Sequence, residues 1–175
     1  LSAFRKLWEK GYNVTLCIIG QIGWKCDEMV AAIRSDPHFG TRLFLLTNAL
    51  DDELEYAYRN CKAVVCASHA EGFGLPLVEA MHFGKPVLAS DLPVFREIGR
   101  EYALFFSLSG PSELISAVER IEEGESVPGR PPAWPTWQES VDKLFSKLLT
   151  MAKQIDDKRC SALVNICQEF DSGTN

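Results

Sequence analysis

The chain alternates regularly between short apolar runs and segments whose apolar residues have helical spacing. The apolar runs are residues 14–19, 43–46, 63–67, 86–89 and 103–106. Unbroken apolar runs of this length are typical of strands that are covered on both faces. Neighbouring parallel strands need a crossover, and a helical segment lies between each pair of runs. The alternation therefore predicts an α/β fold built on a doubly wound parallel sheet.

The helical segments are bounded by ordinary start and stop signals. Gly11 and Gly84 each follow a helical pattern and are expected to end it, whereas Asp51 is expected to cap the helix over residues 51–60. Pro76 suits the first turn of a helix that we expect over residues 76–82. The remaining helices are predicted at the start of the chain, over 27–34, shortly after residue 93, and over 111–121.

The composition predicts one folded domain followed by a separate helix. We expect an α/β domain over residues 1–123, a Pro- and Gly-rich linker over 124–136, and an amphipathic closing helix over 137–153. Residues 154–175 are open to two interpretations, a further helix or a partly disordered end. The chain begins inside a helical pattern without an initiator methionine, so we expect a segment upstream of Leu1.

The charge and the cysteines exclude several classes of protein. A net charge of -6 argues against binding to nucleic acid, which requires a surplus of basic residues. No apolar run approaches the roughly 18 residues of a membrane span, and no signal peptide is evident, so a cytoplasmic location is expected. The 6 cysteines form no C-x-x-C pair, and we expect buried free thiols instead of a metal site or disulfides.

In an open parallel sheet, ligands bind beyond the carboxyl ends of the strands. The loop over residues 68–75 follows the third predicted strand and opens a helix. Gly72 and Gly74 would let a ligand approach the backbone, and Gly74 is expected to need a positive φ or a close contact. The free N–H groups at the helix start suit a diphosphate. Glu71 and Glu79 can accept hydrogen bonds from sugar and ribose hydroxyls.

This segment resembles the two-glutamate motif of the retaining glycosyltransferases of group 1, which combine two Rossmann-like domains in the GT-B fold. The similarity includes Glu71-Gly72-Phe73-Gly74-Leu75-Pro76-Leu77-Val78-Glu79-Ala80 and, after it, Gly84-Lys85-Pro86-Val87-Leu88-Ala89-Ser90-Asp91. The sequence of residues 93–98 is similar to the corresponding segment of bacterial O-antigen and polysaccharide mannosyltransferases. The resemblance extends over residues 1–121, and more weakly over 137–149.

The resemblance implies a set of site residues and a substrate class. Glu71 would be the catalytic residue at the transferred sugar. The donor nucleotide-sugar would be bound by Gly72, Phe73, Gly74, Leu75, Glu79, Gly20 and Thr47, with Glu79 at the ribose and Thr47 in the loop that meets the nucleobase. GDP-mannose is the favoured donor, and a UDP-sugar is the alternative. No cofactor and no metal are implied, and the sequence has no His or Asp cluster at ligand spacing.

By the same resemblance, the chain would be the C-terminal half of a GT-B fold without its first strand. A glycan or lipid-linked acceptor, and any peripheral contact with the inner face of the membrane, would belong to an N-terminal domain upstream. We therefore expect no sugar transfer by this chain alone. Two other functions remain open, an inactive nucleotide-binding or interaction module and half of a sugar-nucleotide 2-epimerase. An upstream Rossmann-like unit of about 150–200 residues would favour the transferase.

Overall fold

The computed structural model describes the backbone of residues 1–125 and 135–172, and the side chains of residues 1–125 and 135–155. Residues 126–134, which make up most of the predicted linker, lie outside the described residues. The chain divides into two compact units, Leu1–Pro132 and Ala133–Asn175.

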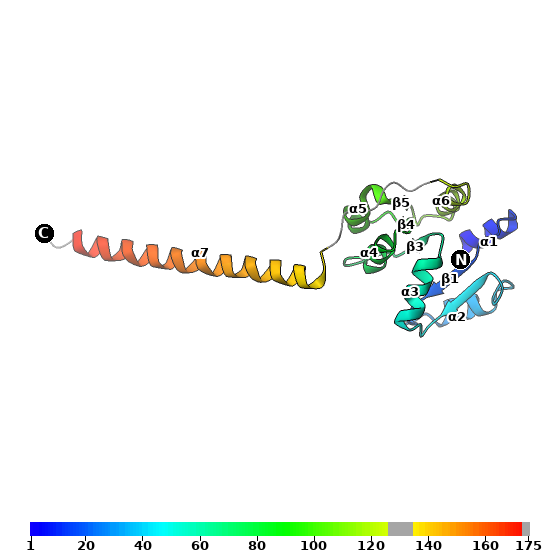
Figure 1. The fold of residues 1–175 in the computed structure, drawn as a ribbon, viewed down its shortest axis with the longest axis horizontal. Helices are drawn as coiled ribbons and strands as arrows, with labels where there is room; N and C mark the ends of the chain where they lie inside the picture. Colours follow the sequence, from blue (N-terminus) through cyan, green and yellow to red (C-terminus); the bar gives the residue numbers. More distant parts are fainter. Residues whose placement is uncertain (126–134, 173–175) are drawn as a thin grey trace. The chain divides into compact units, whose positions relative to one another are not determined.

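The first unit alternates strands and helices as the sequence predicts (Figure 1). The elements in order are α1 (Ser2–Glu9), β1 (Leu16–Ile19), α2 (Asp27–Arg34), β2 (Leu43–Leu46), α3 (Asp51–Asn60), β3 (Val64–Cys66), α4 (Leu75–His82), β4 (Val87–Ser90), α5 (Pro93–Gly99), η1 (Arg100–Tyr102), β5 (Ala103–Phe106) and α6 (Ser112–Glu122). The second unit contains α7, a single helix over Trp137–Ser172 that continues beyond residue 153.

All strand pairs are parallel. β1 pairs with β2, and a second sheet has the order β3-β4-β5. Within the described part of the chain, no ladder of hydrogen bonds joins β1 to β3, so the parallel strands form two sheets instead of one. The carboxyl ends of β3, β4 and β5 meet at one edge, because parallel strands end on the same side. The loop in which the two-glutamate motif begins leaves the sheet at this edge.

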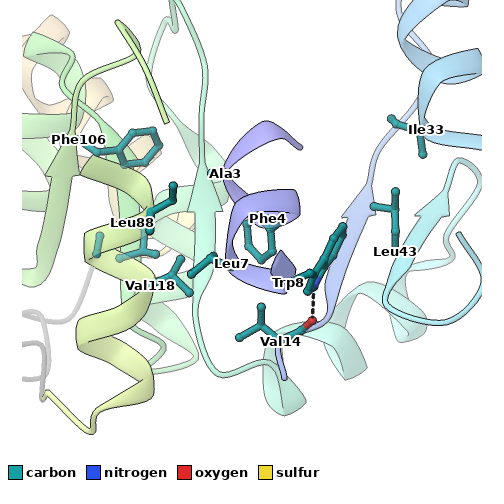
Figure 2. Close-up of a cluster of buried hydrophobic side chains, with 12 residues drawn as sticks. Ala3, Phe4, Leu7, Trp8, Val14, Ile33, Leu43, Leu88, Phe106 and Val118 are labelled. Carbon is teal, nitrogen blue, oxygen red and sulfur yellow. Dashed lines mark hydrogen bonds between the residues drawn. The ribbon is translucent and has the colours of Figure 1, made fainter. Parts of the chain in front are cut away.

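One hydrophobic core serves both sheets. Helix α1 contributes Phe4, Leu7 and Trp8, which are all buried. Figure 2 shows these side chains between Leu88, on the side of the three-stranded sheet, and Leu43, on the side of the two-stranded sheet. The Trp8 indole Nε1 donates a hydrogen bond of 2.8 Å to the carbonyl oxygen of Val14, and Figure 2 draws this bond as a dashed line. Helix α1 therefore holds the two sheets together through a shared core.

A buried carboxylate ties the first helix to the loop before β2. The side chain of Asp36 is 0% exposed. It accepts a hydrogen bond of 2.6 Å from Arg5 Nε on α1 and one of 2.9 Å from the backbone N–H of His38. The His38 N–H, and after it the Arg5 guanidinium, lower the pKa of Asp36. A buried charge is stable only with such partners, and here the partners connect two separate elements.

The helix ends follow the sequence signals with one exception. Gly11 and Gly84 both have a positive φ directly after a helix, as their positions predict. Asp51 is the first residue of α3 and not its cap, so that prediction was wrong. Leu50 stands at the cap position, and its N–H donates to Glu53 Oε2 at 2.9 Å. The carboxylate three residues inside the helix satisfies the end that Asp51 was expected to satisfy.

The cysteines differ in their exposure. The four thiols within residues 1–125 are free, and Cys66 at the end of β3 is buried, as expected. Cys17 is exposed, which contradicts the prediction of a buried thiol. It lies opposite Phe44 in the β1–β2 pair, and Phe44 is also exposed at 37%. This face of the two-stranded sheet is uncovered, although its residues are apolar.

Candidate functional site

The candidate site begins in the loop between β3 and α4, which two serines hold in place. Ser90, at the end of β4, is 0% exposed, and its hydroxyl donates to the carbonyl oxygen of Ser68 at 2.6 Å. The Ser68 hydroxyl in turn donates to Glu71 Oε1 at 2.7 Å. A chain of hydrogen bonds thus runs from the central strand through the loop to the carboxylate of Glu71, whose side chain is exposed. The sheet therefore orients a carboxylate that a ligand can reach.

Gly74 ends this loop in a conformation that favours glycine. Its φ of 90° and ψ of 53° lie in the left-handed region, and it occupies the cap position of α4. A Cβ atom at this position would lie 2.5 Å from Cε1 of the buried Phe95. Both expected reasons for a glycine are therefore confirmed. Gly72 differs, because it has no positive φ and no atom within 4 Å of an added Cβ.

The start of α4 presents unused backbone donors. Within residues 1–125, the N–H groups of Gly72, Phe73, Gly74 and Leu75 donate in no described hydrogen bond. The next residue, Pro76, has no N–H, and the N–H of Leu77 donates to the carbonyl oxygen of Gly74 at 3.1 Å. The amino end of a helix carries a partial positive charge. This end of α4 therefore suits an anion that accepts several hydrogen bonds.

Glu79 lies farther along α4, and a tyrosine from another helix holds it. The Tyr58 hydroxyl on α3 donates to Glu79 Oε2 at 2.8 Å. The Tyr58 ring stacks on Phe83, with ring centroids 5.3 Å apart and an angle of 10° between the planes. Tyr58 is buried and Glu79 is half-buried. No local sequence signal indicates Tyr58 as a site residue, because 21 positions separate it from Glu79.

The negative charges of both glutamates affect one buried thiol, that of Cys66. Burial raises the pKa of the Cys66 thiol to about 11, and the negative charges of Glu71 and Glu79 act in the same direction. Burial and the hydrogen bond to Glu79 likewise raise the pKa of Tyr58, so its hydroxyl stays a neutral donor at ordinary pH. Both carboxylates therefore act on one buried thiol at the end of β3.

Two predicted residues lie at the end of the other sheet. Gly20 follows β1 and Thr47 follows β2, and the strand residues before them, Ile19 and Leu46, are paired. The N–H of Gly20 donates to the carbonyl oxygen of Leu46 at 3.0 Å. The pairing brings Gly20 and Thr47 together. No hydrogen bond described within residues 1–125 joins either of them to the loop before α4.

The described residues hold neither a candidate metal site nor a membrane-spanning helix. In residues 1–125 and 135–155, no group of three or more His, Cys, Asp or Glu side chains is placed to hold a metal ion. No helix in the described part of the chain combines the length and the apolar character that crossing a bilayer requires.

Comparisons with known proteins identify close relatives of the sequence. The family model of the group 1 glycosyl transferases matches residues 1–130. The serotype-specific mannosyltransferase WbdA of Escherichia coli is 37% identical over 156 residues, which is 87% of this chain and 19% of WbdA. The O-antigen chain mannosyltransferase RfbU of Salmonella typhimurium is 31% identical over 68% of this chain and 33% of its own length.

A solved structure supports the fold independently of close sequence similarity. The crystal structure of TarM, a GT-B glycosyltransferase, matches 70% of this chain with a TM-score of 0.58 at 19% identity. The match covers 24% of TarM, and the chain spans about a fifth of the length of WbdA. The parallel strands, their crossover helices and this likeness give the chain the Rossmann-like architecture of one half of a GT-B fold. The chain belongs to the group 1 family of glycosyl transferases.

Proposed function

We propose that the chain is the donor-binding domain of a retaining glycosyltransferase, which transfers a hexose from a nucleotide-sugar to a glycan or lipid-linked acceptor. One observation carries the proposal. Glu71 lies before helix α4 and Glu79 lies within it. At the amino end of this helix, four consecutive N–H groups are unused in the described hydrogen bonds. This arrangement offers acceptors for hydroxyl groups on both sides of a site for a diphosphate.

The diphosphate would bind at the start of α4. Its oxygens would accept hydrogen bonds from the N–H groups of the loop and the first helical turn, and the partial positive charge of the helix end would favour them. When the bond from the sugar to the diphosphate breaks, negative charge grows on the leaving phosphate oxygen. Donors that are already in position stabilise that charge without reorganisation. The proposed contribution to catalysis is electrostatic, and it requires no metal and no cofactor.

The two glutamates would recognise the two ends of the donor. Glu71, held by Ser68 but still exposed, would contact the transferred sugar. Glu79 would accept hydrogen bonds from the ribose hydroxyls through the oxygen that Tyr58 does not use. Gly20 and Thr47, together at the end of the other sheet, would lie beside the nucleobase.

The names of the relatives favour mannose as the transferred sugar. WbdA and RfbU are both mannosyltransferases, and the name of RfbU refers to an O-antigen chain. We therefore propose GDP-mannose as the donor and a growing polysaccharide as the acceptor, with a UDP-sugar as the alternative donor. Since the chain spans about a fifth of WbdA, the acceptor contacts are assigned to a second domain. The expected cytoplasmic location stays a prediction.

Calorimetric titration of the intact protein with GDP-mannose, a UDP-hexose and an ADP-hexose tests this proposal. We expect saturable binding of GDP-mannose and weaker binding of the other two. Tighter binding of the UDP-hexose would show that the base of the donor is uracil and not guanine, and the donor would still be a nucleotide-sugar. Absence of binding by all three would contradict the proposal. Product analysis with the full-length protein separates transfer from epimerisation, because an epimerase releases a modified sugar and leaves the acceptor unchanged.

A further inference from the structure

We propose that Tyr58 is a positioning residue that fixes the orientation of the Glu79 carboxylate for the ribose of the donor. This inference rests on the proposed function, because it deepens the role that Glu79 has there. Tyr58 comes from α3, outside the motif; its hydroxyl donates to Glu79, and its ring stacks on Phe83. Its role would be to select one rotamer of Glu79.

The geometry gives Tyr58 a fixed position of its own. The ring is 9% exposed and stacks on Phe83, which follows the last turn of α4. The guanidinium of Arg59 lies over the Phe83 ring, 5.1 Å from its centroid. The hydroxyl therefore points to Glu79 from a ring that packing already holds. A donor fixed in this way restricts the carboxylate more than a mobile side chain or water would.

The hydrogen bond leaves the other carboxylate oxygen available. Tyr58 donates to Oε2, and Oε1 of Glu79 accepts no described hydrogen bond within residues 1–125. An ionised carboxylate has about four acceptor sites, so a bound diol can be accommodated beside the tyrosine. Without the hydroxyl, the Glu79 carboxylate would lose its preferred direction. Ligand binding would then have to order the side chain, which lowers affinity.

The test compares Tyr58→Phe with the parent protein in calorimetric titrations of GDP and of 2′,3′-dideoxy-GDP. The substitution keeps the ring and its stacking on Phe83. We expect the affinity for GDP to fall about three- to tenfold, and the affinity for the dideoxy compound to stay unchanged. A purely structural role would lower both affinities equally. Tyr56→Phe is the matched control, because Tyr56 lies on the same helix and is 70% exposed.

Combination with Glu79→Ala separates this inference from the proposed function. If Glu79→Ala leaves GDP binding unchanged, the ribose contact itself is wrong. If Glu79→Ala weakens binding and Tyr58→Phe does not, only the role of Tyr58 is wrong. In the Glu79→Ala background, Tyr58→Phe should have no further effect on GDP affinity, and an additional loss would contradict the proposal. A Tyr58→Phe protein that fails to fold would also contradict it, since the hydroxyl would then serve the fold.

Discussion

A Cβ atom on Gly74 would lie 2.5 Å from Cε1 of Phe95, so the loop before α4 can approach α5 this closely only as glycine. The positive φ of 90° adds a second constraint. We predict that Gly74→Ala destabilises the fold by about 2–4 kcal/mol and weakens nucleotide binding, through the left-handed backbone and the clash together. Chemical denaturation and titration measure the two effects. Gly72→Ala is the control for stability alone, and equal stability of the two variants would show that Gly74 is an ordinary turn residue.

The buried hydroxyl of Ser90 is predicted to stabilise the same loop. Ser90→Ala would leave the carbonyl oxygen of Ser68 without its donor, which costs about 1–3 kcal/mol in a buried setting. We expect a lower free energy of unfolding and a less fixed orientation of the Glu71 side chain, which Ser68 holds. Ser116→Ala on the exposed face of α6 should change neither quantity. If Ser90→Ala is as stable as the parent, the hydrogen bond does not fix the loop.

The pairing of Asp36 predicts a dependence of stability on pH. The pKa of Asp36 in the folded chain lies below its ordinary value of 3.8, so the ionised form stabilises the fold above that value. This contribution is lost as the pH falls through the folded-state pKa. Asp36→Asn should therefore be less stable than the parent near pH 7, and the difference should shrink near pH 3. An unchanged difference across this range, measured by denaturation, would contradict the role of the Asp36 charge.

Glu71 is predicted to recognise the sugar and not the nucleotide. Glu71→Gln should lower the affinity for GDP-mannose roughly tenfold, because a charged acceptor at the sugar is lost. The affinity for GDP should stay the same, which makes GDP the internal control. Parallel titrations of both ligands provide the measurement. A similar loss of affinity for GDP and GDP-mannose would indicate that Glu71 acts at the phosphates or in the loop structure, and not at the sugar.

Much of the fold could be predicted from local sequence patterns. The bounds of α2, β2 and β5 agree with the predicted ranges, because apolar runs and clear stop signals limit these elements on both sides. The cap of α3 could not be predicted from residue type alone. Asp51 is a good capping residue, but Glu53 reaches back to the N–H of Leu50, and Leu50 occupies the cap position.

The candidate site could be proposed from the sequence where its residues lie in one motif. Gly74 and Glu79 both belong to that motif, and the structure adds the reason for the glycine. The contacts of Tyr58 with Glu79 and of Phe95 with Gly74 depend on how helices from different segments pack. No periodicity in the sequence encodes such pairs. The separation of the strands into two sheets, and the exposure of Cys17, depend in the same way on packing between elements.

The central claim is that the chain binds a nucleotide-sugar through the ribose contact of Glu79. Calorimetric titration of GDP-mannose into the parent protein, Glu79→Ala and the exposed control Glu97→Ala tests it most directly. We predict saturable binding by the parent and the control, and roughly ten- to a hundredfold weaker binding by Glu79→Ala, since a charged hydrogen-bond acceptor is lost. Equal affinity of the parent and a correctly folded Glu79→Ala variant would contradict it.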